Sequence, residues 1–143
     1  MSGSIPSPSV IKTAARDLKM LTKPNDKILA FSGVILVESN RRTIHGAEVL
    51  PFSYQPLFTS EICRKNVAVN NEILAESLKN KEFAALALTT GTFATVCPFI
   101  TPTPKTIEDS IWDTVNRYYY VVKRYPLSLQ EKEEVLIYLP KMD

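Results

Sequence analysis

The chain has 143 residues, of which 45% are hydrophobic and 22% charged, and its 17 basic and 15 acidic side chains leave a net charge of +2. This composition is typical of one globular domain and excludes extended disorder, while a charge of +2 is too small to indicate a partner. Two cysteines, one histidine and four glycines exclude a disulfide framework, the usual zinc sites and phosphate-binding loops, so we expect no metal and no cofactor.

Residues 1–9 are rich in Ser and Pro, and we expect them to form a disordered tail. They carry no basic region followed by an apolar one, so they predict no secretory signal. No apolar run approaches the ~20 residues that a membrane-spanning helix needs. We therefore expect a soluble intracellular protein, which could lie peripherally on a membrane.

Residues 10–23 have apolar side chains at helical spacing, with Ser9 available as the N-cap and Pro24 ending the helix. The basic side chains form one stripe on this helix: Lys12, Arg16, Lys19 and Lys23. The apolar side is narrow and includes alanines, so we expect a contact element outside the main core. A second copy would cover its apolar side and an anionic partner would meet its cations. The alternative is an ordinary core helix with its lysines in water.

We expect residues 24–143 to form a single α+β domain. The clearest strand is predicted over 27–38, apolar on both faces and therefore central, with 43–50 as its hairpin partner. Helices are predicted over 59–65 and 70–80. A second hairpin is predicted over 83–90 and 92–100, although 82–90 could instead extend the preceding helix. The predicted architecture is an antiparallel sheet of two hairpins with packed helices.

A long helix is predicted from Ile107 to about Tyr125, with Thr106 as its cap and complementary charges in its end turns. Ser128 and Glu131 form a capping box for a final segment, in which 133–139 could be helix or strand. The strands and this helix supply a predicted core: Ile28, Phe31, Ile35, Val37, Phe83, Leu86, Phe93, Val96, Ile111, Trp112, Val115, Tyr118 and Val122.

The conventional nucleophile and base candidates are Cys63, Cys97 and His45. Nothing around them resembles a catalytic signature, and unpaired cysteines are usually buried. Asp109 and Asp113 are four residues apart, but acidic residues near a helix N-terminus need no catalytic explanation. The sequence therefore predicts a protein that is not an enzyme.

Aromatic and basic residues alternate near the end of the long predicted helix. We expect its exposed side to carry Arg117, Tyr120, Lys123 and Arg124. An exposed tyrosine among cations could stack on a base and cover a phosphate, which is the basis of an alternative, nucleic-acid-binding function. Phe52 and Tyr54 lie in a proline-bounded loop, where they could form an interaction patch or tuck under the sheet.

The lack of a catalytic signature, a metal site and a phosphate-binding loop in the sequence favours a non-enzymatic assembly or protein-interaction module that self-associates. The order of a flexible, basic, proline-containing N-terminus and a compact α+β domain resembles the small matrix and accessory proteins of some RNA viruses. This resemblance in layout implies self-association and contact with a membrane or nucleocapsid. The expected partners are a second copy of the chain, RNA or an anionic membrane surface. The alternative is an accessory protein that binds nucleic acid through the helix predicted over 117–125.

Overall fold

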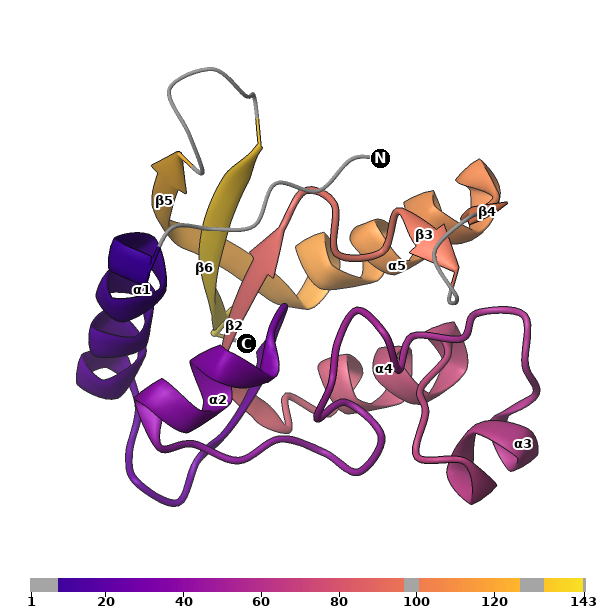
Figure 1. Cartoon of the computed structure of the whole chain (residues 1–143), viewed down its shortest axis with the longest axis horizontal. Coiled ribbons are helices and arrows are strands. Elements are labelled where there is room, and N and C mark those ends of the chain that lie inside the picture. Colours follow the sequence, from indigo (N-terminus) through magenta and orange to yellow (C-terminus); the bar gives the residue numbers. More distant parts are fainter. Residues whose placement is uncertain (1–7, 97–100, 127–132, 143) are drawn as a thin grey trace.

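The computed structural model describes residues 8–96, 101–126 and 133–142, and Figure 1 shows how their helices and strands are arranged. Along the chain they are α1 (Pro8–Leu21), β1 (Lys27–Ala30), α2 (Gly33–Ser39), α3 (Ser60–Lys65), α4 (Asn71–Lys79), β2 (Phe83–Thr89), β3 (Thr95–Val96), β4 (Thr101–Pro102), α5 (Lys105–Tyr118), β5 (Tyr119–Pro126) and β6 (Glu134–Pro140). The α+β class is confirmed.

The main sheet has the strand order β1-β2-β6-β5. Strand β1 pairs with β2 in parallel, whereas β2 with β6 and β5 with β6 are antiparallel. A purely antiparallel sheet of two hairpins is therefore wrong, and the sheet is mixed. The parallel pair arises because the chain crosses back through α2, α3 and α4 between β1 and β2, as a parallel pairing requires.

The strand predicted over 27–38 is shorter than expected and does not lie at the centre of the sheet. Strand β1 ends at Ala30, because the Ser32 side chain accepts a hydrogen bond from the Val34 backbone nitrogen at 3.2 Å and caps α2. This local capping outweighs the strand propensity of the apolar residues that follow. Residues 43–50 contain no strand and instead form turns, so the first predicted hairpin is absent.

The strand predicted over 83–90 is confirmed as β2, but its antiparallel partner is β6 rather than the residues after Gly91. Instead, β3 pairs with the short strand β4. The open question at 133–139 is resolved as a strand. The predicted capping box at Ser128 and Glu131 lies outside the described residues.

The long helix predicted over 107–125 is wrong in its second half. Helix α5 ends at Tyr118, and the Tyr-Tyr-Val-Val run that follows forms β5. Aromatic and β-branched residues favour strands, and β6 supplies the partner. The residue at the N-cap of α5 is Pro104 rather than Thr106. The predicted helices over 59–65 and 70–80 are confirmed as α3 and α4, capped by the side chains of Thr59 and Asn70.

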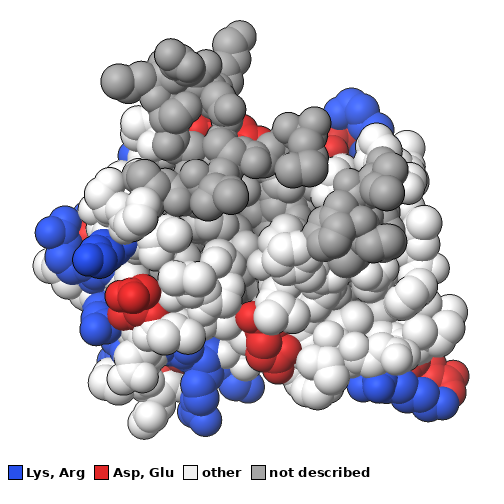
Figure 2. Space-filling view, in the orientation of Figure 1, with Lys and Arg blue, Asp and Glu red and all other residues white. Residues whose placement is uncertain are grey.

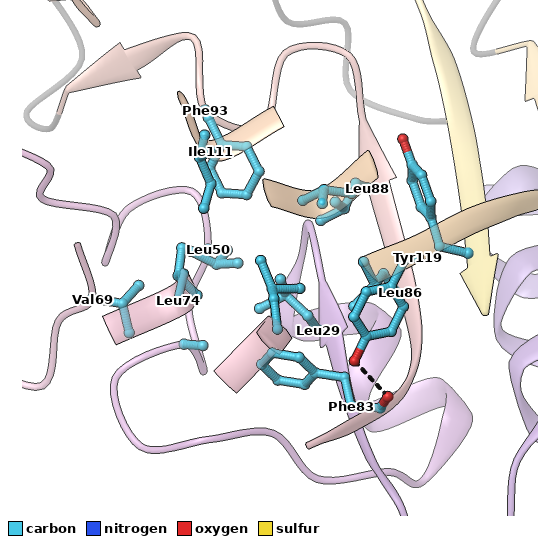
Figure 3. Packing of buried hydrophobic residues seen from close by; sticks show 14 of the residues in the cluster. Leu29, Leu50, Val69, Leu74, Phe83, Leu86, Leu88, Phe93, Ile111 and Tyr119 are labelled. Carbon is cyan, nitrogen blue, oxygen red and sulfur yellow. Dashed lines mark hydrogen bonds between the residues drawn. The ribbon is translucent and has the colours of Figure 1, made fainter. Parts of the chain in front are cut away.

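The larger hydrophobic cluster fills the space between the sheet and helices α4 and α5 (Figure 3). Within it the Tyr119 hydroxyl donates a hydrogen bond to the Phe83 carbonyl at 2.8 Å. Phe93 meets Tyr54 and Trp112 edge-on, with ring centroids 5.0 and 5.4 Å away. These contacts join the loop before α3 to α5 and the sheet.

Most of the predicted core is confirmed. The buried members are Ile28, Phe31, Ile35, Phe83, Leu86, Phe93, Ile111 and Val115, and the partly buried members are Trp112, Tyr118 and Val122. Val37 is wrong: it is 79% exposed, because it lies on the outer side of α2 instead of in a strand. The side chain of Val96 is not among those that the structure describes.

A second cluster on the other face of the sheet contains α1. The side chains of Ala14 and Leu18 are fully buried there, so the expectation that α1 lies outside the core is wrong. Strand β2 presents Ala85 and Ala87 to this cluster, and such small side chains let a narrow helix face approach closely. The helix begins at Pro8, so the predicted N-cap, Ser9, lies within it, and residues 1–7 of the predicted tail are outside the described residues.

Candidate interaction surfaces

The two catalytic candidates that the structure describes, Cys63 and His45, do not form a reactive group. Cys63 is buried in α3, where its Sγ lies 3.8 Å from the Gln55 carbonyl oxygen, and burial raises the pKa of its thiol. His45 is exposed in a turn, with its Nδ1 4.0 Å from a Glu48 carboxylate oxygen. Neither contact activates a nucleophile. Cys97 lies outside the described residues, which contain no group of three His, Cys, Asp or Glu side chains that could hold a metal.

The paired carboxylates of α5 lie on its outer side. Asp109 is paired with Lys105 at 3.2 Å, and Asp113 is exposed. Together with four other residues they line a depression of about 470 Å³: Thr106, Asp109, Ser110, Asp113, Thr114 and Arg117. All six come from this one helix. A reactive centre usually draws convergent groups from several elements, so this depression does not resemble one.

The predicted basic stripe is exposed: Lys12, Arg16 and Lys19 lie on α1, whereas Lys23 lies beyond it, because the helix ends at Leu21 and not at residue 23. Figure 2 shows basic atoms gathered on the side of the molecule where α1 lies. On the same helix, the buried Asp17 carboxylate lies 3.8 Å from Arg16 and 3.4 Å from Lys123 of β5. Asp17 therefore ties α1 to the outer strand of the sheet.

The residues of the predicted nucleic-acid surface do not share one face. Arg117 lies in the last turn of α5, and Tyr120, Lys123 and Arg124 lie on β5. Lys123 pairs with Ile137 and lies on the α1 side, whereas Arg124 pairs with Leu136 and lies on the opposite side. Arg124 is 3.7 Å from Glu134. The expected grouping depended on a continuous helix, which the structure replaces with a strand.

Strand β5 lies at the edge of the sheet, where it could pair with another chain. Its pairing with β6 is interrupted by an irregularity between Val121 and Lys123, and it carries Lys123, Arg124 and Pro126. Bulges, edge lysines and prolines are the features with which proteins hinder pairing between edges. Strand addition at β5 is therefore disfavoured.

Large apolar side chains are exposed together on the segment around α3, which projects at the lower right of Figure 1. We call the following four residues the arm patch: Leu57 (62% exposed), Phe58 (44%), Ile62 (44%) and Val67 (47%). The loop before it carries Phe52 and Tyr54, for which the sequence allowed either an exposed patch or burial under the sheet, and the structure shows one of each. Phe52 is about half exposed, whereas Tyr54 is fully buried and its hydroxyl donates a hydrogen bond to the Asn71 side-chain oxygen.

The segment that carries the arm patch, which we call the arm, is held in place by hydrogen bonds at its base. The Asn70 side chain donates to the Phe58 carbonyl at 3.0 Å, and the Gln55 nitrogen donates to the Val69 carbonyl at 2.8 Å. Gly46 packs beneath it with φ of 96°, where an added Cβ would lie 2.5 Å from the Ala68 carbonyl oxygen. The backbone of the arm patch is thus preformed.

Charges of both signs accompany the arm patch. Helix α3 carries Glu61, Arg64 and Lys65, all exposed, and Glu61 lies 3.2 Å from Lys65. In Figure 2 the face over the arm is mostly uncharged, with acidic and basic atoms together at its lower edge. The surface is therefore apolar in part and nearly balanced in charge, unlike the α1 stripe.

Comparisons with protein families, curated proteins and solved structures returned no match for this chain. None of the described helices is long and apolar enough to cross a bilayer. The case for a function therefore depends on the surfaces themselves.

Proposed function

We propose that this protein is a non-enzymatic assembly module that self-associates through the arm patch. The observation that carries this proposal is the group of four large exposed apolar side chains on one hydrogen-bonded segment. Single exposed apolar residues are ordinary, but several of them within one short segment favour a contact site. Because the arm is already ordered, binding loses little conformational freedom there.

A second copy of the chain fits this surface by charge. In a twofold-symmetric pair the same patch meets itself, so a surface with both signs can place acid against base. Glu61 of one copy can then face Arg64 or Lys65 of the other copy. A strongly acidic partner would be repelled by Glu61, and a strongly basic partner would be repelled by both Arg64 and Lys65, so neither is complementary to the whole surface.

Other routes to self-association have less support. The apolar side of α1 is buried against the sheet, and β5 carries features that hinder edge pairing. The exposed basic stripe of α1 remains our proposed contact for an anionic partner, and in Figure 1 it lies on the opposite side of the molecule from α3. The nucleic-acid alternative has less support, because Tyr120 and Lys123 lie on the α1 side of β5, whereas Arg124 lies on its other side and Arg117 lies on α5.

Sedimentation velocity over a wide range of protein concentration tests the proposal. We expect the wild-type chain to self-associate and Leu57→Asp to weaken association at least about tenfold, since a charge would be buried without a partner. Unfolding should be little changed, because Leu57 is mostly exposed. Val37→Asp, which alters an exposed valine on α2, and Lys19→Glu, in the basic stripe, are matched controls that should associate as the wild type does.

A wild-type chain that stays monomeric at every concentration would overturn the proposal. So would equal dissociation by Leu57→Asp and Val37→Asp, because the effect would then follow charge in general rather than the arm.

A further inference from the structure

One residue of the arm patch has a backbone conformation that its side chain disfavours. Val67 has φ of 52°, in the left-handed region, and immediately follows Asn66, the C-cap of α3. Glycine or asparagine usually occupies this position, since a β-branched side chain there is strained. Asn40, which caps α2 with φ of 54°, shows the usual choice in this same chain.

Hydrogen bonds on both sides impose this conformation. The Asn66 nitrogen donates to the Cys63 carbonyl at 3.1 Å, and the Ala68 nitrogen donates to the same oxygen at 3.0 Å. One residue later, the Val69 nitrogen donates to the Ser53 carbonyl at 2.9 Å. Residue 67 cannot move to an extended conformation without breaking these bonds.

Core packing does not explain a valine at this position. Ala68 and Val69 are buried, but the Val67 side chain is 47% exposed. An apolar side chain that strains the backbone and remains about half in solvent contributes little to the folded monomer. The parallel bridge between Tyr54 and Val69 places the backbone of residue 67 at the end of the bridge where Phe52 lies.

We infer that Val67 is a contact residue of the self-association surface, at which folding stability is given up for contact with the second copy. The inference depends on the proposed function and adds to it a stability trade-off at one residue of the arm patch. Asparagine at this position relieves the strain and removes the apolar contact, so stability and association change in opposite directions.

The experiment measures both quantities for Val67→Asn. In the Leu57→Asp background, where association does not contribute to stability, we expect Val67→Asn to raise Tm by about 3–8 °C. In the otherwise wild-type chain we expect it to weaken self-association about fivefold or more in sedimentation velocity. Val49→Asn is the matched control, since Val49 is 52% exposed and is not among the residues with positive φ. It should change neither quantity.

The outcomes separate the two claims. A raised Tm with unchanged association would overturn the contact role of Val67 and leave the proposed function in place. An unchanged or lowered Tm for both Val67→Asn and Val67→Gly would show that no strain is relieved, which also overturns the inference. A wild-type chain that is monomeric at every concentration overturns the proposed function and, with it, the inference.

Discussion

Replacing Leu18 by alanine tests how far α1 contributes to the stability of the domain. The Leu18 side chain is fully buried between α1 and the sheet, in the cluster that includes Ala85 and Ala87. These alanines are too small to fill the space that would be left. A leucine-to-alanine change at such a site costs about 3–5 kcal/mol. Domains of this kind are stable by about 5–15 kcal/mol, so this loss is a large share of the free energy of unfolding. It lowers Tm by on the order of 10 °C.

The measurement is urea unfolding followed by circular dichroism, with Met20→Ala as the control on the same helix. Met20 is 78% exposed, so its replacement should change the free energy of unfolding by less than about 0.5 kcal/mol. We also expect deletion of residues 1–23 to unfold the domain, since it removes one side of the second cluster. Equal stability of the Leu18→Ala and Met20→Ala variants would refute this reasoning and return α1 to the role of a contact element.

Two further predictions concern buried titratable groups. Burial raises the pKa of Tyr119 to about 12, and the pKa values of Tyr54 and Tyr138 are raised for the same reason. The folded chain therefore keeps these protons at a pH where the unfolded chain loses them, so the contribution of these tyrosines to the free energy of unfolding should be constant below about pH 10 and fall above it. Tyr119→Phe should reduce this fall and cost about 1 kcal/mol at neutral pH through the lost hydrogen bond to Phe83, which urea unfolding at neutral pH and near pH 11 can measure. The buried Cys63 thiol should react slowly with a thiol reagent in the folded protein and quickly once urea unfolds it; rapid labelling of Cys63 in the folded state would reopen an enzymatic interpretation.

Local hydrogen-bonding signals were sufficient for some elements. Thr59 and Asn70 each precede a short apolar pattern, and their side chains cap α3 and α4, the two helices predicted there. Ser32 makes the same kind of bond, but it lies inside an apolar run that is equally typical of a strand. At Tyr119 the chain changes from helix to strand without a glycine or proline, and the reason is pairing with β6, the next strand along the chain.

The surfaces were harder to predict than the elements. The basic stripe of α1 follows from helical spacing alone, but the burial of its other side depends on two alanines of β2. The arm patch left only a weak signal in the sequence: α3 has six residues, too few for an apolar period to show which side faces inward. Helix and loop residues therefore contribute to the patch together, and their common surface exists only in the folded chain.

In the proposed assembly, folding and contact are carried by different residues. Leu18 and Tyr119 lie in the two clusters on opposite faces of the sheet, whereas Leu57 and Val67 lie on an arm whose helix buries a single residue, Cys63. Substitutions on the outside of the arm can therefore change association without unfolding the domain. The hydrogen bonds at the base of the arm link the two parts, because they fix the backbone that displays the patch. The proposed role of Val67 is consistent with this arrangement: if the clusters supply the stability, one residue of the arm can lose some of it in exchange for contact.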